Sequence, residues 1–144
     1  MDDACRLYDL PQAERNALLV AVGAALGRVA SVRLGYAFGS FARGEKFRDL
    51  DLALLLDPAA AWWEPAEAAQ QAWQAAGRPP WDIDVIALDD AAVVFRRGIV
   101  LQAGLIFERE AGQARAYEVR VLSLASDLSA WIGAREAERG LAHG

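Results

Sequence analysis

Two aspartates separated by one residue, Asp49 and Asp51, stand at the start of an apolar run and are well suited to chemistry. In an extended strand alternate side chains point to one face, so both carboxylates lie opposite Leu50 and Leu52. Two ionised carboxylates this close repel each other, and a cation between them relieves the repulsion. Mg²⁺ suits such a pair, because it prefers oxygen ligands and binds one or two carboxylates together with substrate phosphates.

A third carboxylate, Asp84, begins another short apolar stretch. If this stretch is a strand beside the one that carries Asp49 and Asp51, Asp84 completes an acidic triad. It would then be placed to act as the base on an attacking hydroxyl. Asp82 stands two residues earlier, close to a pair of prolines, and we assign it to a solvated loop.

A glycine and a serine, Gly39 and Ser40, directly follow a predicted strand. If a helical turn comes next, its free backbone N–H groups and the serine hydroxyl face outward together, which favours binding of a phosphate. Arg43, Lys46 and Arg48 add cations nearby. The sequence therefore predicts a phosphate-binding turn close to the acidic residues.

Composition limits what kind of protein positions these residues. With 144 residues, 55% hydrophobic and 24% charged, the chain has the length and balance of one globular domain and not of a disordered segment. Its net charge of −5 argues against a polymeric nucleic acid as ligand, whereas a single nucleotide remains compatible. One cysteine and one histidine exclude an intramolecular disulfide and a Cys/His metal cluster.

No part of the sequence indicates a membrane or secretory role. The first residues lack the basic and apolar regions of a signal peptide. No apolar run approaches the roughly 20 residues that a membrane span requires. We therefore expect a cytoplasmic protein without a membrane partner.

The hydrophobic pattern predicts eight elements that alternate between helix and strand. Their ranges, beginning with a helix, are 11–29, 31–38, 50–56, 62–76, 83–88, 91–103, 105–108 and 113–139, with strands second, third, fifth and seventh. This order indicates an α/β or α+β domain with one small mixed β-sheet flanked by helices. We expect a single domain over residues 1–144, whose core over about 32–110 lies between the first and last helices.

Two adjacent tryptophans, Trp62 and Trp63, begin the helix predicted over 62–76. Neighbouring residues on a helix cannot both be centred on one buried stripe. We therefore expect one of the two to be exposed, which is typical of an interface.

The run from Gly39 to Gly44, the pair Asp49 and Asp51, and Asp84 on a later strand resemble the signature of the nucleotidyltransferase superfamily that includes DNA polymerase beta. Within it, the small size and the stretch 95–109 resemble the minimal nucleotidyltransferase (MNT) domains. MNT domains are encoded beside HEPN-domain toxins and act as their antitoxins. The resemblance extends over roughly residues 32–116.

This resemblance implies a polymerase beta-like fold, Mg²⁺, a nucleoside triphosphate donor such as ATP, and transfer of a nucleoside monophosphate to a hydroxyl. Carried over by position, the catalytic and metal-binding residues are Asp49, Asp51 and Asp84, and the nucleotide-binding residues are Gly39, Ser40 and Arg43. We therefore expect AMP transfer from ATP to a partner protein, a HEPN toxin encoded by the neighbouring gene, within a hetero-oligomer.

Two alternatives remain open. Eight residues separate Ser40 from Asp49, fewer than is usual in the family, and Arg48 replaces a small polar residue. These departures favour a module with little or no activity that neutralises its partner by binding and masking it. Transfer to a small molecule is less favoured, because the chain is too short for the additional substrate domain of such enzymes.

Overall fold

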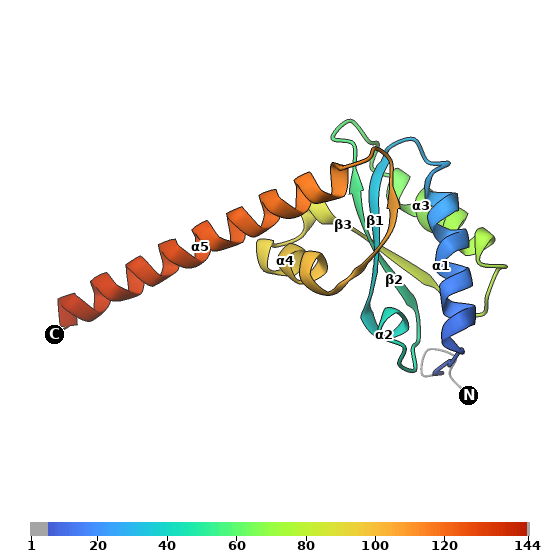
Figure 1. The fold of residues 1–144 in the computed structure, drawn as a ribbon, viewed down its shortest axis with the longest axis horizontal. Coiled ribbons are helices and arrows are strands. Elements are labelled where there is room, and N and C mark those ends of the chain that lie inside the picture. Colours follow the sequence, from blue (N-terminus) through green and yellow to red (C-terminus); the bar gives the residue numbers. More distant parts are fainter. Residues whose placement is uncertain (1–5, 144) are drawn as a thin grey trace.

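A four-stranded mixed sheet with helices on both faces forms the body of the molecule in the computed structural model, which describes residues 6–143 and side chains through residue 137 (Figure 1). The elements in chain order are α1 (Gln12–Leu26), β1 (Val32–Phe38), α2 (Gly39–Ala42), β2 (Leu50–Leu56), α3 (Glu64–Ala75), β3 (Ile83–Ala87), the short 3₁₀ helix η2 (Leu88–Asp90), α4 (Val93–Gln102), β4 (Gly104–Glu108) and α5 (Gln113–His143). The predicted fold class is confirmed.

The strands lie in the order β3-β2-β1-β4. β1 is antiparallel to both of its neighbours, β2 and β4, whereas β2 and β3 are parallel. The condition set for Asp84, that its strand lies beside the strand of Asp49 and Asp51, is therefore met. Because β1 runs opposite to β2 and β3, its carboxyl end meets their amino ends at one edge of the sheet.

The central strand β2 is buried on both faces, which explains its uninterrupted apolar sequence. Leu52 and Leu54 belong to the core between the sheet and the helices α1 and α3. Ala53 and Leu55 belong to a second core, which α4 and α5 cover. Figure 1 shows the two helix pairs on opposite sides of the sheet.

The helix predicted over 62–76 is shorter at its start, because α3 begins at Glu64 with Pro65 in its first turn. Trp62 and Trp63 therefore precede the helix. Their exposed fractions are 87% and 55%, and their rings contact each other edge to face. The prediction that one of them is exposed is confirmed, and the second is exposed as well, because the helix begins only after them.

The last helix, α5, only partly packs on the body. Ala114, Tyr117, Val121 and Ala125 are buried, whereas residues 126–137 are all exposed. Figure 1 shows the far part of α5 projecting away from the sheet.

Within residues 6–143, none of the helices combines the length and apolar character needed to cross a bilayer.

Candidate functional site

Strand register brings the predicted acidic residues together. Asp51 is paired with Asp84 across the parallel strands β2 and β3, and with Phe38 across β1 and β2. Paired residues on neighbouring strands share a face and lie about 5 Å apart. Asp49 precedes β2 by one residue and stands two positions before Asp51. All three carboxylates thus lie at the edge where β2 and β3 begin.

The environment of Asp51 disfavours its charged form. Burial is the main cause of its raised pKa, followed by the charges of Asp84 and Asp49, whereas Arg43 acts in the opposite direction. Burial and like charges both oppose ionisation of a carboxyl group. The side chain is therefore placed where a cation would stabilise it.

The pKa of Asp49 is raised for similar reasons. Burial contributes most, then the charge of Asp84, then the charge of Asp82, and a hydrogen bond with Asp84 adds to the shift. Arg48 lowers the pKa and so partly opposes these effects. The arginine that departs from the family pattern therefore acts directly on the first of the predicted acidic residues.

Asp82 lies in a loop before β3, as the sequence predicted, and it also belongs to this acidic group. It is exposed, yet its charge acts on Asp49, and its backbone carbonyl accepts a hydrogen bond of 3.1 Å from the N–H of Leu50. The signal was present in the sequence, because Asp82 and Asp84 repeat the Asp-x-Asp spacing of Asp49 and Asp51.

The turn after β1 packs directly against the acidic group. Gly39 has a φ of +80°, in the left-handed region that favours glycine. A Cβ at this position would lie 2.5 Å from the Asp51 Oδ2 atom. Both the conformation and the close approach therefore require glycine here. The turn continues into the four-residue helix α2, as the sequence predicted conditionally.

A cationic side chain lies beside this turn. The Arg43 guanidinium donates to Ser40 Oγ at 3.4 Å and forms an ion pair of 2.9 Å with Glu45. It also acts on the pKa of Asp51. The structure thus brings Ser40, Arg43 and Asp51 together, whereas the side chains of Lys46 and Arg48 are exposed.

A cavity of about 390 Å³ opens beside the turn and is lined by Phe38, Gly39, Arg43 and residues of α1, α4 and β4. Phe38 and Phe95 meet edge to face on its wall, with ring centroids 5.5 Å apart. A cavity of similar volume near Tyr117 lies at the opposite end of β2, away from the acidic residues.

The donor set fits Mg²⁺ chemically. Among residues 6–137, no three Asp, Glu, His or Cys side chains are arranged to hold a metal ion by themselves. Mg²⁺ does not need such a cage, because it usually binds one or two carboxylates and takes its other ligands from phosphates and water. Asp49 and Asp51, whose charged forms are destabilised, are the side chains that such an ion would stabilise.

One known family matches the region of the chain that carries these residues. The family described as "Polymerase beta, Nucleotidyltransferase" matches residues 24–111, which is more than half of the chain. The matched range includes the turn at Gly39 and the four aspartates of the acidic group, Asp49, Asp51, Asp82 and Asp84. No curated protein is significantly similar to this sequence.

Solved structures share the fold at low sequence identity. One is a complex of a tri-AMPylated HEPN toxin with an MNT antitoxin from Shewanella oneidensis, with 22% identity, a TM-score of 0.60, and 88% of this chain and 96% of that chain covered. A toxin–antitoxin structure with AMP-PNP has 23% identity, a TM-score of 0.60, and 90% and 98% covered. A third, the toxin–antitoxin MntA-HepT, has 20% identity, a TM-score of 0.59, and 89% and 97% covered.

Proposed function

Because this chain belongs to the polymerase beta nucleotidyltransferase family, we propose that it transfers AMP from ATP to a hydroxyl group of a partner protein, a HEPN toxin, in the cytoplasm. One observation carries the proposal. The turn at Gly39 packs against Asp51, which shares its face of the sheet with Asp49 and Asp84. This arrangement supports a phosphate-binding turn beside a site for Mg²⁺.

The turn would bind the triphosphate of ATP. The first N–H groups of a helical turn have no partner within the helix, and the Ser40 hydroxyl and Arg43 guanidinium add two further donors. Arg43 would exchange part of its pairing with the exposed Glu45 for the phosphates. Pyrophosphate would leave toward this cationic side of the site, where Arg43 would stabilise the negative charge of the leaving group.

Transfer needs an activated acceptor. The oxygen of the partner's hydroxyl attacks the α-phosphorus and forms a new O–P bond, while the bond from the α-phosphorus to the bridging oxygen breaks and pyrophosphate leaves. Asp84, on the exposed edge strand β3, would accept the hydroxyl proton. Positioning and charge stabilisation supply most of the catalysis in such reactions.

Asp49 and Asp51 would hold Mg²⁺, with Asp84 as the third carboxylate. When bound, the ion would neutralise charge on the phosphates during transfer. Burial and neighbouring carboxylates destabilise the charged forms of the two aspartates, as the raised pKa of each indicates. A divalent cation reverses that penalty.

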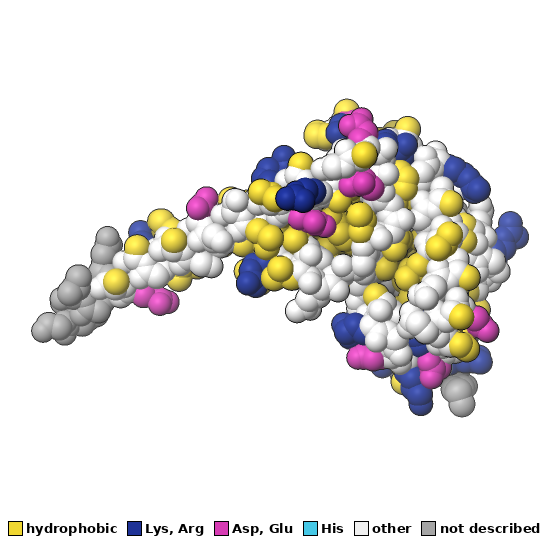
Figure 2. All heavy atoms as spheres, viewed as in Figure 1, with side chains coloured by type: hydrophobic (Ala, Val, Ile, Leu, Met, Phe, Trp, Pro, Cys, Tyr) yellow, Lys and Arg dark blue, Asp and Glu magenta, His cyan; other side chains and the backbone are white. Residues whose placement is uncertain are grey.

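The toxin partner is proposed on two grounds. The structural relatives are described as toxin–antitoxin complexes, one with an AMPylated toxin. This chain also exposes large apolar side chains on α5, among them Leu128, Trp131 and Ile132 (Figure 2). Exposed apolar patches often mark protein interfaces.

A masking module is the second candidate. It is favoured by the short connection of eight residues between Ser40 and Asp49, and by Arg48, whose charge acts on the pKa of Asp49. In that case the protein would bind its partner without modifying it.

The test is the intact mass of the neighbouring gene's product after incubation with this protein, ATP and Mg²⁺. The double variant Asp49→Asn/Asp51→Asn removes the proposed metal ligands. The matched control, Asp89→Asn/Asp90→Asn, removes two exposed carboxylates from η2, outside the site.

We expect the wild-type protein and the control to add one or more AMP units, and the site variant to add none. If no protein adds mass but the complex still forms, the masking function replaces the enzymatic one. Full transfer by the site variant would refute the assignment of the site.

A further inference from the structure

A buried arginine on the opposite face of the sheet connects α1 to the proposed nucleotide-binding turn. Arg15, in the first turns of α1, is only 1% exposed. Its guanidinium donates to the backbone carbonyls of Phe41 at 3.0 Å and Glu45 at 2.8 Å. These two carbonyls bracket the segment that carries Arg43. One side chain therefore holds both ends of the segment.

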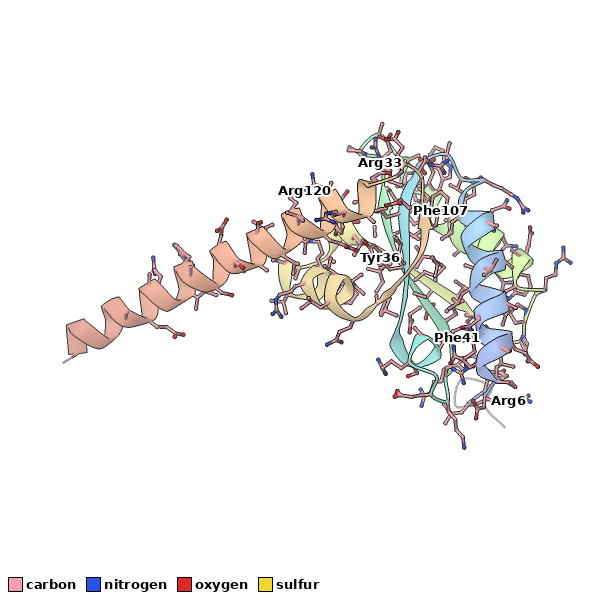
Figure 3. The ribbon with its side chains drawn as sticks, viewed as in Figure 1. Arg6, Arg33, Tyr36, Phe41, Phe107 and Arg120 are labelled. Atoms are coloured by element: carbon pink, nitrogen blue, oxygen red, sulfur yellow. The ribbon has the colours of Figure 1, made fainter. Side chains whose placement is uncertain are left out.

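The remaining contacts fix the guanidinium itself. It donates to the Leu10 carbonyl at 2.8 Å and to Asp9 at 2.7 Å. It also lies over the rings of Phe41 and Phe47, at 5.3 and 5.1 Å from their centroids. Figure 3 shows Phe41 between α2 and the start of α1. The arginine is thus held from several sides and has little freedom to move.

Packing alone does not account for an arginine at this position. Burying a charge is unfavourable unless hydrogen bonds and a counter-charge compensate for the lost water. An apolar side chain would fill the space between α1 and the two phenylalanines without that penalty. What only the planar, five-donor guanidinium provides is simultaneous attachment to several carbonyls in a fixed geometry.

The attached segment is the short connection between Ser40 and Asp49. The Glu45 N–H donates to the Ser40 carbonyl at 3.0 Å, and Phe47 pairs through its backbone with Tyr8. Movement of the Glu45 carbonyl would therefore displace Ser40 and the start of β2 relative to each other. These are the two parts of the site that must bind one nucleotide.

We propose that Arg15 is a positioning residue of the nucleotide site, which sets the distance between the phosphate-binding turn and the metal-binding aspartates. This inference rests on the proposed function. Arg15 itself touches no substrate and acts through the Phe41–Glu45 segment.

The experiment compares Arg15→Lys with a matched control, Arg109→Lys. Arg109 also donates to three backbone carbonyls, those of Val32, Gly27 and Val29, and lies 5.1 Å from the centroid of the Phe107 ring, but it is remote from the turn. Lysine keeps the charge but cannot reach several carbonyls in one plane. For each protein we would measure the KM for ATP, the kcat of AMP transfer and the hydrogen exchange of residues 39–47.

We expect Arg15→Lys to raise the KM for ATP and to lower kcat, so that kcat/KM falls by about 10-fold or more, because misplacement by about 1 Å can weaken catalysis by about 100-fold. Exchange over residues 39–47 should become faster. Arg109→Lys should leave the KM for ATP, the kcat and the exchange of residues 39–47 near the wild-type values, even if it lowers Tm.

A second variant guards against misfolding of the first. Asp9 is 62% exposed, so Asp9→Asn removes the counter-charge without disturbing the core, and it should give a smaller change in the same direction. Equal KM values for Arg15→Lys and Arg109→Lys would overturn the positioning role. Failure of the wild-type protein to bind ATP would instead overturn the proposed function, and the role of Arg15 with it.

Discussion

At the scale of single residues, the acidic group is placed against the preference of its own side chains. The pKa of Asp51 is raised mainly by burial and then by its acidic neighbours, so the charged form is less stable in the folded protein than in the unfolded chain. A folded protein with such a group loses stability once the group ionises. The charged form of Asp51 therefore lowers the stability of the fold, and the cation that we propose would offset this loss.

We predict that Asp51→Asn increases the free energy of unfolding at pH 7 in the absence of Mg²⁺. Wild-type stability falls as the pH rises from the ordinary aspartate pKa of 3.8 through the raised pKa of the folded state, and the variant lacks this loss. The gain should therefore shrink toward zero as the pH falls to 3.8 and below. Urea denaturation of both proteins between pH 7 and pH 3.8 measures this difference in unfolding free energy.

The exposed residue Asp127, on α5, provides the control, because Asp127→Asn should change stability little at any pH. Lower stability of Asp51→Asn at pH 7 would contradict the argument from burial and charge. In the transfer assay the same variant should lose about 100-fold or more, since even outer-shell partners of a metal contribute about 10–100-fold.

Gly39 supports a second prediction, in which strain and collision are separated. Gly39→Ala places a Cβ 2.5 Å from Asp51 Oδ2, and it also forces alanine to a φ of +80°. The left-handed conformation alone costs about 1–2 kcal/mol. We expect a larger loss of unfolding free energy than this, together with at least about 10-fold weaker AMP transfer, because Asp51 must move.

Gly77→Ala is the matched variant, since Gly77 has a φ of +86° but a Cβ there would meet nothing within 4 Å. It should lose stability through strain and keep its transfer activity. If the two variants behave alike in both assays, the close approach of Gly39 to Asp51 has no functional role.

At the scale of elements, hydrogen bonds connect α5 to the sheet, and the Ala114 N–H donates to a Glu108 carboxylate oxygen on β4 at 2.9 Å. The hydroxyl of Tyr36 on β1 donates to a Glu118 carboxylate oxygen at 2.9 Å. Burial, and then Glu118, raises the pKa of Tyr36, so the tyrosine stays a donor at neutral pH. The neighbouring Tyr117 hydroxyl is buried without a hydrogen-bond partner among residues 6–137.

We expect Tyr36→Phe to lower the free energy of unfolding by about 1.5–3 kcal/mol, the range for a hydrogen bond to a charged group. Tyr117→Phe also removes one hydroxyl group, but this hydroxyl makes no hydrogen bond with residues 6–137, so the substitution should be neutral or slightly stabilising. Chemical denaturation of both variants provides the comparison. A greater loss for Tyr117→Phe would show that the link between Tyr36 and Glu118 does not hold α5 in place.

At the scale of the whole molecule, stability resides in the body and not in the far part of α5. Leu34 is fully buried in the core under α4 and α5, whereas Leu128 and Trp131 are 38% and 58% exposed. Burial of apolar surface is the main stabilising contribution in folding. The projecting part of α5 therefore contributes little to the fold of the isolated chain.

The double variant Leu128→Ala/Trp131→Ala should change the free energy of unfolding by no more than about 0.5 kcal/mol, as is usual for surface substitutions. Leu34→Ala should reduce it by about 2–5 kcal/mol, because it leaves a cavity in the core. Thermal and urea unfolding of the isolated chain distinguish the two. A large loss for the double variant would mean that α5 folds back onto the body.

Much of the fold followed from local patterns in the sequence. The apolar run of β2 indicated a strand, and the hydrophobic pattern along α1 and α5 indicated helices. Bounds were less accurate where glycine and proline decide them: α1 ends at Leu26 before Gly27, and α3 begins next to Pro65. The proximity of the Gly39-Ser40 turn to Asp49 and Asp51 could also be predicted, because these residues are close in sequence.

The sequence by itself determined which residue types stand at the ends of the strands, and so the class of chemistry that we propose. Only the tertiary structure decided that Asp84 lies opposite Asp51, that Asp82 acts on Asp49, and that Arg15 holds the turn. Strand register and burial depend on how distant apolar faces pack together, and a one-residue shift would turn Asp84 to the other face. Local patterns carry no record of such contacts, because the residues involved meet only when the chain has folded.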